Sequence, residues 1–469
     1  MTLPLPKPHD WPFDAELLRR YDGPGPRYTS YPTAPHFSAD FSAQDFVRAA
    51  VNSNVGAFSR LLSLYLHVPF CRSPCFYCGC NRSITRDQAQ GDEYVALLKR
   101  EIALVAPLFD GSREVIQLHL GGGTPNFLRP AQLADLVAEL GRLFAFSDDP
   151  GRDFSIELDP RFVDANDIAV LARAGFNRAS LGVQDFDPQV QLAVNRIQSL
   201  EQTREIVDAC RDQKMRSVNI DLIYGLPLQT QRGFARTLEQ VIALRPDRLA
   251  VYGYAHLPRL FRAQRQIEEQ DLPSAEEKLA LLGLAVEALS AAGYRYIGMD
   301  HFALPGDDLA VAQRRGDLHR NFMGYTTHAQ TDLLGLGVSA ISHVGDSFCQ
   351  NQRELPAWQA ALEEGRLPIM RGLLLDNDDV LRADVIQRLM CLGEVEFEPV
   401  ERSHGIVFGD YFHDAIDALA PLVQDGLVQV LQDRIQVTAR GRGLLRVIAM
   451  RFDRYLDLPG QPVRHSRTI

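Results

Sequence analysis

Four of the seven cysteines in this 469-residue chain lie within ten residues, at Cys71, Cys75, Cys78 and Cys80. The first three have the spacing C-x3-C-x2-C and directly follow a β-branched and aromatic run that predicts a strand. A loop with this spacing can turn three thiolates toward one point while it leaves a fourth coordination position open. Such a site suits a [4Fe–4S] cluster with one iron free for another ligand, and it indicates redox or radical chemistry.

A zinc site, a disulfide framework and a chance cluster account for these cysteines less well. A structural zinc site usually adds a second Cys or His pair, but Cys210, Cys349 and Cys391 each stand alone. A disulfide framework does not suit a long, cysteine-poor chain without a secretory leader. Four small buried residues that cluster by chance are the third alternative. Cys80 is too close to Cys78 for both to reach separate corners of one cube, so we expect Cys80 to face the site without binding iron.

The bulk composition is that of a soluble globular enzyme, with 46% apolar and 23% charged residues. No apolar run reaches the roughly 18 residues that span a bilayer, and the proline-rich start has no signal-peptide core, so the expected location is the cytoplasm. The 49 basic residues are outnumbered by 60 acidic ones, a net charge of −11. This argues against a nucleic-acid partner, although local arginines can still bind an acidic small molecule.

Strand-like runs alternate with amphipathic helical stretches through the first half of the chain. This alternation predicts parallel strands joined by right-handed crossovers, in either an open doubly wound sheet or an incomplete barrel. Distinctive polar residues follow nearly every strand, and a ring of strand ends that meet at one mouth favours the barrel. The predicted strands are residues 63–68, 115–120, 154–158, 178–183, 217–223 and 249–254, and the helices include 93–109, 130–144, 168–174, 200–213 and 234–244.

Two flanking parts differ from this pattern. Residues 1–45 are rich in proline and aromatic residues and predict an extended segment that lies on another part of the molecule. Beyond residue 375 the sequence predicts helices at 379–392 and 415–424 and a hairpin at 427–437, in a winged-helix-like order. For an acidic chain, a lid or packing domain is favoured over DNA binding. The predicted domains are therefore 1–45, 46–375 and 376–469.

Further polar positions are candidates for ligand binding. Residues 121–125, Gly-Gly-Gly-Thr-Pro, let a ligand approach the backbone, or they form a simple tight turn. Glu157 and Asp221 lie near strand ends, where a carboxylate can hold ribose hydroxyls or an ammonium group. His67 and His119 alternate with apolar neighbours, and we expect both to be hydrogen-bonded core residues. The glycine-rich run at 324–341 is expected to be a loop near a ligand, and the arginines of 258–265 and 313–320 are either exposed charges or anchors for a polyanionic substrate.

The cysteine loop followed by Gly-Gly-Gly-Thr-Pro is similar to the radical S-adenosylmethionine superfamily. Within it, the chain resembles the oxygen-independent coproporphyrinogen III oxidase family over almost its whole length. The motifs that carry this resemblance are residues 26–33, 78–81, 119–125, 219–227, 254–258, 298–302 and 324–327.

The resemblance implies the following function. S-adenosylmethionine binds the open iron, and its cleavage yields a 5′-deoxyadenosyl radical that abstracts a hydrogen from the β-carbon of a propionate. Loss of CO2 and one electron leaves a vinyl group, and two such events convert coproporphyrinogen III to protoporphyrinogen IX in haem biosynthesis. The expected electron donor is a flavodoxin-type protein, and the expected quaternary state is a monomer.

The resemblance also implies roles for individual residues. Cys71, Cys75 and Cys78 are the expected cluster ligands, and Cys80 and Tyr65 are expected to take part in catalysis. Two S-adenosylmethionine molecules are expected. The residues expected to bind the first molecule are Tyr65, Gly122, Glu157 and Ile341. The residues expected to bind the second molecule, or to lie between the two, are Tyr77, Cys80, Gly123, Thr124, Gln184, Arg196, Asp221 and Ala255. Residues 27–33 are expected to fold over the substrate site.

Two functional alternatives come from other classes. The haem-chaperone branch of the same superfamily shares the three cysteines but lacks the fourth cysteine and the run at residues 27–33, both of which are present here. A non-catalytic electron carrier is the other alternative. Such carriers are usually small and bind every iron through a thiolate, unlike this long chain with a three-cysteine site.

Overall fold

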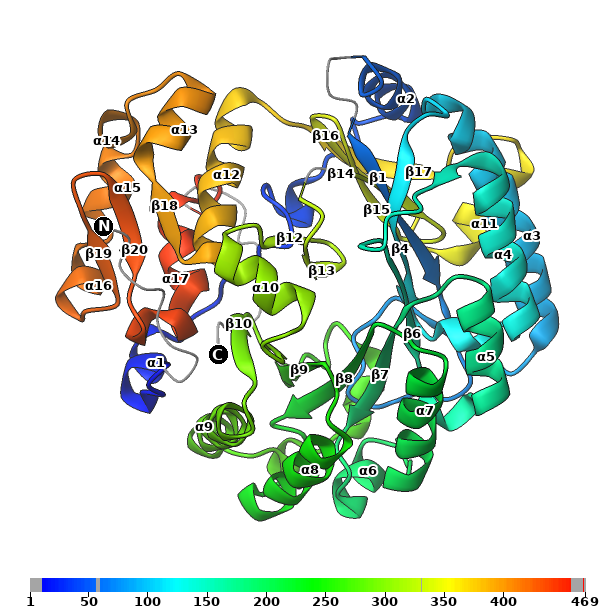
Figure 1. Cartoon of the computed structure of the whole chain (residues 1–469), viewed down its shortest axis with the longest axis horizontal. Helices are drawn as coiled ribbons and strands as arrows, with labels where there is room; N and C mark the ends of the chain where they lie inside the picture. Colours follow the sequence, from blue (N-terminus) through cyan, green and yellow to red (C-terminus); the bar gives the residue numbers. More distant parts are fainter. Residues whose placement is uncertain (1–10, 56–59, 330, 457–466, 468–469) are drawn as a thin grey trace.

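The computed structural model describes residues 11–55, 60–329, 331–456 and 467, so the proline-rich residues 1–10 lie outside the described part of the chain. Its centre is a curved sheet of parallel strands that does not close on itself (Figure 1). This arrangement confirms the incomplete six-stranded barrel that the sequence predicts. The six strands are β1 (Leu61–Val68), β4 (Glu114–Gly122), β6 (Asp153–Leu158), β7 (Arg178–Gln184), β8 (Ser217–Tyr224) and β9 (Arg248–Gly253).

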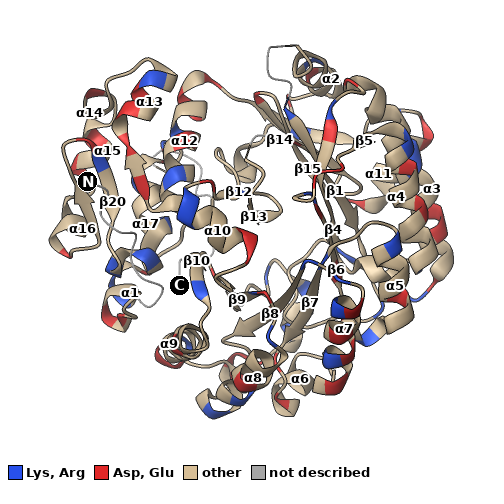
Figure 2. Cartoon of the chain, viewed as in Figure 1, with Lys and Arg blue, Asp and Glu red and all other residues tan. Residues whose placement is uncertain are grey.

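Helices cover the outer face of this sheet (Figure 1). Their starts carry local signals, such as Pro130 at the first position of its helix and the Ser199–Gln202 capping box. Figure 2 shows acidic and basic residues interspersed along these helices, as expected for faces in contact with water. The helices are α3 (Gln88–Val105), α4 (Pro130–Leu143), α5 (Ala165–Arg173), α7 (Leu200–Asp212) and α8 (Gln231–Leu244).

The prediction of a loop across 324–341 is wrong, because this segment contains strands. β14 (Thr331–Leu336) pairs in parallel with β1, with Leu334 opposite Leu64. β13 (Gly324–Thr326) and β15 (Ile341–Val344) are also strands. The glycines are required by close packing: a Cβ on Gly335 would lie 2.4 Å from the carbonyl oxygen of Ile341. The strand is buried on both faces, so it lacks the alternation that identifies a half-exposed strand.

The sheet has two free sides, which other elements cover. Beyond β9 it continues into β11 (His301–Ala303) and β10 (Arg295–Gly298), whereas beyond β14 it continues through β15 into β16 (Ser347–Asn351) and β17 (Ile369–Leu374). Between these two sides lie the hairpin of β12 (His319–Asn321) and β13, and α10 (Asp308–Arg315) (Figure 1). Side chains and loops, rather than a closed hydrogen-bonded ring, therefore complete the barrel.

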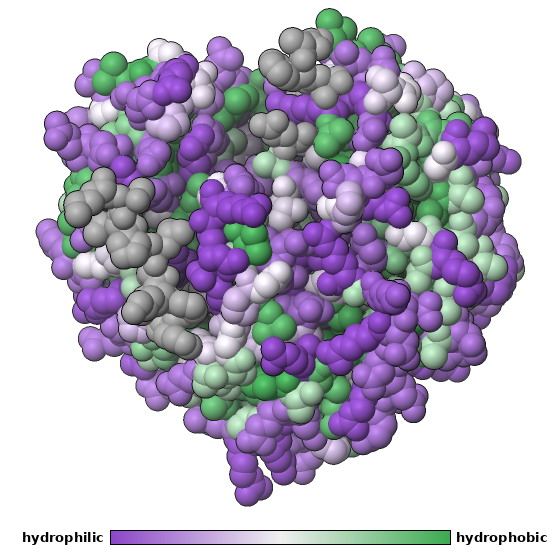
Figure 3. Space-filling view, in the orientation of Figure 1, coloured by the Kyte–Doolittle hydropathy of each residue, from purple (hydrophilic) through white to green (hydrophobic). Residues whose placement is uncertain are grey.

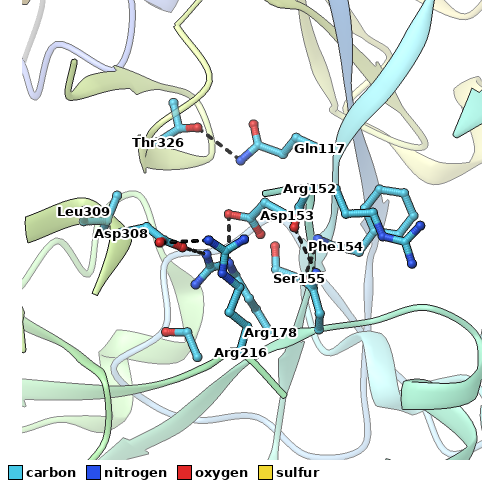
Figure 4. Close-up of polar contacts among 12 residues, drawn as sticks. Gln117, Arg152, Asp153, Phe154, Ser155, Arg178, Arg216, Asp308, Leu309 and Thr326 are labelled. Atoms are coloured by element: carbon cyan, nitrogen blue, oxygen red, sulfur yellow. Dashed lines mark hydrogen bonds and ion pairs between the residues drawn. The ribbon is translucent and has the colours of Figure 1, made fainter. Parts of the chain in front are cut away.

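An ion-pair network closes the end of the barrel where the strands begin (Figure 4). Arg178, only 5% exposed, pairs with Asp153 at 3.3 Å and with Asp308 at the start of α10. Arg216 contacts the same Asp308 at 2.9 Å. Beside them, Gln117 Nε2 donates a hydrogen bond of 3.3 Å to Thr326 Oγ1 of β13 (Figure 4). The starts of four barrel strands are thus tied to α10 and the β12–β13 hairpin.

The N-terminal segment contains more regular structure than the sequence suggests. α1 (Ala15–Tyr21) and α2 (Ala43–Asn52) flank an extended stretch, and Trp11 stacks on Tyr296 of β10 with ring centroids 4.5 Å apart. Tyr28 Oη donates a hydrogen bond of 3.0 Å to Asp453 near the C-terminus. The N-terminal segment therefore contacts both the barrel and the C-terminal part of the chain.

The C-terminal part is mostly helical, as predicted. The predicted first helix and hairpin are confirmed by α12 (Asn377–Leu392) and by β19 (Val428–Val430) paired with β20 (Arg434–Val437). β18 (Glu394–Glu396) adds a third strand. The predicted helix at 415–424 is instead two short helices, α15 (His413–Asp417) and α16 (Ala420–Gln424). Every helix in the described ranges is too short or too polar to cross a membrane.

Glu101 of α3 is a buried carboxyl that organises the added side of the sheet. It is 1% exposed and accepts hydrogen bonds from Gly337 N at 2.8 Å, Asn351 Nδ2 at 2.6 Å and Trp358 Nε1 at 3.1 Å. Trp358 belongs to α11 (Leu355–Glu363). Burial outweighs these hydrogen bonds and raises the pKa of Glu101 to about 7. The folded protein therefore binds this proton more tightly than the unfolded chain does.

We expect Glu101→Gln to reduce the pH dependence of stability. Because the pKa of Glu101 is higher in the folded state, its stabilising contribution is complete below the unfolded pKa and is lost as pH rises toward 7. The loss amounts to at most about 3 kcal/mol in the free energy of unfolding. Denaturant unfolding from about pH 5 to about pH 8 measures this slope. The control is Glu93→Gln, at an exposed position of the same helix; equal slopes for wild type and Glu101→Gln would contradict the assignment.

Candidate active site

The cysteine loop follows β1 at the end of the barrel where the parallel strands finish. Its two arms are held together by β2 (Phe70–Cys71) and β3 (Ser83–Ile84). Ser83 N donates to Pro69 O at 2.7 Å, and Thr85 N donates to Cys71 O at 3.0 Å. These bonds close the loop at its base, so the three cysteines between them have a restricted arrangement.

Each of the three expected cluster ligands has a polar partner at its sulfur. Cys71 Sγ lies 3.3 Å from Thr124 Oγ1, and Cys78 Sγ accepts from Cys80 N at 3.4 Å. Cys75 Sγ is contacted by Arg196 at 3.6 Å and by Arg161 at 3.8 Å. Hydrogen bonds to thiolate sulfur stabilise negative charge and tune the potential of an iron–sulfur cluster. The donor set of this loop therefore fits a cluster.

The thiols differ in their electrostatic surroundings. A hydrogen bond from Cys80 and the charge of Arg82 lower the pKa of Cys78 to about 6. Burial raises the pKa of Cys71 to about 11. The same interaction with Cys78, together with burial, raises the pKa of Cys80 well above its ordinary value. In this arrangement Cys80 is the thiol that donates to Cys78.

A single bound metal ion is not the arrangement that these side chains form. Within the described residues, no three His, Cys, Asp or Glu side chains are close enough to share one ion. In a [4Fe–4S] cluster each cysteine binds a different iron, so the sulfur atoms are spread over the faces of a cube.

The glycines at the end of β4 bring the backbone close to the cysteine loop. Gly122 has a φ of +116°, and a Cβ there would lie 2.6 Å from the ring of His67. A Cβ on Gly123 would lie 2.8 Å from the backbone of Pro69, directly before the loop. Gly122 N donates to Glu157 Oε2 at 3.1 Å. Side chains at these glycines would meet His67 and the backbone before the loop, so the glycines let the end of β4 pack closely against the cysteine loop.

Polar side chains from neighbouring strands lie together inside the barrel. Tyr65 Oη lies 3.0 Å from His67 Nδ1, whose Nε2 lies 3.0 Å from Asn81 O. His119 contacts Ser155 Oγ at 2.7 Å and Glu157 at 3.4 Å. Both histidines are hydrogen-bonded, as expected, but they also lie beside the expected cofactor residues Tyr65 and Glu157. Sequence reasoning did not identify them as parts of the site.

Asp221 is a second carboxylate inside the barrel. It accepts from Asn219 Nδ2 at 2.8 Å and from Ser180 Oγ at 3.3 Å. Burial, reinforced by the charge of Glu157, raises the pKa of Asp221 to about 7. The charge of Glu157 therefore disfavours the ionised form of Asp221, and a cationic ligand beside Asp221 would favour it.

Asp159 and Arg161 are site residues that sequence reasoning missed. The buried Asp159 accepts from Arg161 Nη2 at 2.7 Å and Arg196 Nη1 at 3.1 Å, and both arginines contact Cys75. Although burial alone would raise it, the two guanidinium groups lower the pKa of Asp159. The signal in the sequence that could have identified Asp159 is its position two residues after Glu157, directly after the same predicted strand.

The expected cofactor residue Gln184 is the last residue of β7 and has a φ of +71°.

The remaining expected cofactor residues lie on segments that border the loop. Gln264 Nε2 donates to Tyr77 O at 2.8 Å and to Ala255 O at 3.2 Å, which joins the cysteine loop to the segment after β9. Ile341 packs against Gly335, and Gly335 pairs with Tyr65 across β1 and β14. Tyr77, Ala255 and Ile341 are thus brought to the same end of the barrel from three distant parts of the chain.

Of the two arginine clusters, only Arg320 is buried. Arg314 and Arg315 are exposed, as are Arg259, Arg262 and Arg265. Arg320 also lines a cavity of about 920 Å³ between the N-terminal segment, the start of β1 and α12. Figure 3 shows the surface indented between the C-terminal helices and the region of α2. The cavity reaches Leu61 at the start of β1, the opposite end from the cysteine loop, so it is separate from the expected cofactor site.

The chain matches the Radical SAM superfamily over residues 65–241 and the HemN C-terminal domain over residues 375–444. The solved structure of coproporphyrinogen III oxidase (HemN) from Escherichia coli, described as a Radical SAM enzyme, has a TM-score of 0.90 and 48% sequence identity. The match covers 95% of this chain and 100% of that one. The open barrel with its three-cysteine loop is therefore that of a radical S-adenosylmethionine enzyme.

Full-length relatives define the family more narrowly. The oxygen-independent coproporphyrinogen III oxidase of Pseudomonas aeruginosa is 51% identical over 97% of this chain and 99% of its own length. The enzyme of the same name from Escherichia coli is 48% identical over 98% of this chain and 99% of its own length. The chain belongs to the family of oxygen-independent coproporphyrinogen III oxidases.

We expect Gly123→Ala to weaken S-adenosylmethionine binding by roughly 10-fold. The added Cβ would meet backbone that cannot move without shifting the cysteine loop, and overpacking of this kind typically costs about 1–3 kcal/mol. The measurements are iron and sulfide content after anaerobic reconstitution, and the change in the spectrum of the reduced cluster as S-adenosylmethionine is added. Gly111→Ala is the control, since a Cβ there meets nothing within 4 Å. Full iron content together with wild-type affinity in Gly123→Ala would show that the close approach is unimportant.

Proposed function

We infer that this chain catalyses the oxygen-independent oxidative decarboxylation of two propionate side chains of coproporphyrinogen III to vinyl groups, giving protoporphyrinogen IX. The observation that carries this inference is the loop of Cys71, Cys75 and Cys78 at the mouth of an open barrel, in a chain related over its whole length to enzymes with this name. The enzyme is a radical S-adenosylmethionine oxidoreductase of haem biosynthesis that uses a [4Fe–4S] cluster and S-adenosylmethionine.

The cluster and S-adenosylmethionine together supply the 5′-deoxyadenosyl radical that removes a hydrogen from the β-carbon of a propionate. In this proposal Cys71, Cys75 and Cys78 hold the cluster, and Arg161 and Arg196 stabilise the charge on the sulfur of Cys75. Asp159 keeps the two arginines in place against their mutual repulsion. Burial of this network strengthens each of its charge interactions.

The protein must also keep water away from a reactive primary radical. Phe76 and Tyr77 of the cysteine loop pack on an apolar cluster that includes Tyr254 and Ile267. Phe76 N donates to Val194 O at 2.9 Å, which fixes the loop against the end of α6 (Pro188–Ala193). The loop is therefore seated on an apolar surface, as the proposed chemistry requires.

We further propose two S-adenosylmethionine molecules. Tyr65, Gly122, Glu157 and Ile341 would serve the first, in support of which the strand register brings Tyr65 and Ile341 to one level of the barrel. The second set, which serves the other molecule or the space between the two, is Tyr77, Cys80, Gly123, Thr124, Gln184, Arg196, Asp221 and Ala255. Within these sets, Tyr65 and Cys80 are the proposed catalytic residues.

The organisation of the protein around this site is also a proposal. Residues 1–45 would act as a strap, residues 46–375 as the catalytic barrel and residues 376–469 as a covering domain. The hydrogen bond from Tyr28 to Asp453 supports a strap that is held by the covering domain. We propose a cytoplasmic monomer that receives electrons from a flavodoxin-type donor and has no nucleic-acid or membrane partner.

The decisive test is an anaerobic assay of the reconstituted protein with coproporphyrinogen III, S-adenosylmethionine and dithionite. We expect protoporphyrinogen IX, detected as protoporphyrin, and 5′-deoxyadenosine to form together. Cys71→Ala, Cys75→Ala and Cys78→Ala should each abolish both products, because each removes a proposed iron ligand. Cys210→Ala is the matched control, because Cys210 is buried in α7 outside the site and the variant should keep its activity.

Different outcomes would favour different functions. Formation of 5′-deoxyadenosine without protoporphyrin would keep the radical chemistry but require another substrate. Stoichiometric haem binding with neither product would support a haem chaperone. A stable reduced cluster that transfers electrons without cleaving S-adenosylmethionine would support an electron carrier.

A further inference from the structure

Arg320 on β12 is a buried cation without an acidic partner among the described residues. It is 5% exposed, and its Nε and Nη1 atoms have no hydrogen-bond partner. Its guanidinium carbon lies 4.8 Å from the ring centroid of Tyr325, its cross-strand neighbour. A cation–π contact recovers only part of the hydration that a buried guanidinium loses. Buried arginines are normally paired with anions, so Arg320 is an exception with a physical cost.

The surroundings of Arg320 are already rich in positive charge. Arg27 of the N-terminal segment pairs with Asp300, and Arg446 donates to the carbonyl oxygens of Gly25 and Pro26. Burial and then the charge of Arg27 lower the pKa of Arg446 to about 10. The charges of Arg27 and Arg320 thus both act on Arg446, so cationic side chains gather in this region.

A row of aromatic rings connects Arg320 to Arg27. Arg27 lies 5.9 Å from the ring of Tyr252, which lies 5.8 Å from the ring of His301. His301 lies 5.4 Å from the ring of Tyr325, on which Arg320 rests. Tyr252 lies two residues after Ala250 on β9, and Ala250 is opposite Asp221, a residue of the proposed cofactor set, on β8. The row thus runs from the proposed cofactor site toward the wall of the 920 Å³ cavity, which Arg320 lines.

Charge on the histidine of this row is disfavoured. Burial, followed by the charge of Arg320, lowers the pKa of His301 to about 4. At neutral pH His301 is therefore an uncharged ring, and the row presents neutral aromatic groups between two cations. Pyrrole rings that carry carboxylates at their edge match this pattern, because each ring can contact the aromatic row while a carboxylate reaches an arginine.

We propose that Arg320 binds a propionate carboxylate of the tetrapyrrole substrate and thereby selects for it, with Arg27 at the other end of the row as a second anchor. The proposal rests on the function inferred above. A carboxylate is the anion that the substrate carries, and a guanidinium binds it through two parallel hydrogen bonds. Binding supplies an anionic partner, which Arg320 lacks among the residues that the structure describes.

The test uses the reconstituted holoenzyme and coproporphyrin III, the stable, fluorescent oxidised analogue of the substrate, which carries the same four propionates. We expect Arg320→Met to weaken binding of coproporphyrin III about 10- to 100-fold, which is the range for loss of charge-assisted hydrogen bonds. Arg320→Lys keeps the charge but not the paired geometry, so an intermediate loss is expected. Arg315→Met is the matched control, because Arg315 is an exposed arginine at the end of α10, and its affinity should equal that of wild type.

Two further measurements separate binding from folding and chemistry. Iron content and the spectral response to S-adenosylmethionine should be unchanged in both Arg320 variants, whereas the KM for coproporphyrinogen III should rise. Wild-type affinity in Arg320→Met, or in Arg320→Lys if the methionine variant does not fold, would overturn the proposal while leaving the proposed function intact. If the wild-type protein neither binds coproporphyrin III nor converts the porphyrinogen, the proposed function fails and this inference fails with it.

Discussion

A sheet that does not close must be sealed by other means, and this constraint governs much of the structure. One side of the sheet ends in β10 and the other in β17, so backbone hydrogen bonds cannot exclude water from the space between them. The seal comes from segments that are far apart in the sequence. The N-terminal segment reaches Asp453 through Tyr28 and Asp300 through Arg27, and the β12–β13 hairpin is tied to the strand starts through Thr326. These contacts join residues that are far apart in the sequence, so they form only when the whole chain is folded. The proposed radical chemistry therefore depends on the integrity of the complete protein.

At the opposite end of the barrel, one carboxylate organises the electrostatics of the cysteine loop. Asp159 binds Arg161 and Arg196, which would otherwise repel each other at a buried site, and directs both toward the sulfur of Cys75. A cluster ligated by three thiolates carries negative charge, and two buried guanidinium groups beside one sulfur stabilise it in either redox state, more strongly in the more negative one. The arrangement would therefore favour the reduced form of the proposed cluster relative to a loop without these arginines.

The parts of this picture that sequence reasoning predicted are those with local signals. Cysteine spacing is local, as are strand-helix alternation and helix capping, and these give the barrel and the loop. β14 was misassigned because a strand buried on both faces has no polar alternation, and its Gly335 is required only by contact with Ile341. Arg320 could not be separated from Arg314 and Arg315, because the three differ only in what surrounds them after folding. Asp159 was missed for the same reason: its role arises from Arg196, 37 residues later in the chain.

The net charge of the chain and the charge inside the fold also differ, because buried and exposed charges have different surroundings. The chain carries a net charge of −11, and Figure 2 shows both signs mixed along the outer helices. Charges on such faces are screened by salt over about 8–10 Å, so they have little effect inside the protein. Arg320 and Arg446 are buried in a less polar environment, where each interacts over a longer range and with greater strength. An acidic protein can therefore present a cationic interior to a substrate with four carboxylates. If Arg320 binds a carboxylate of the substrate as proposed, the bound anion offsets the lost hydration of that guanidinium and contributes to the binding energy.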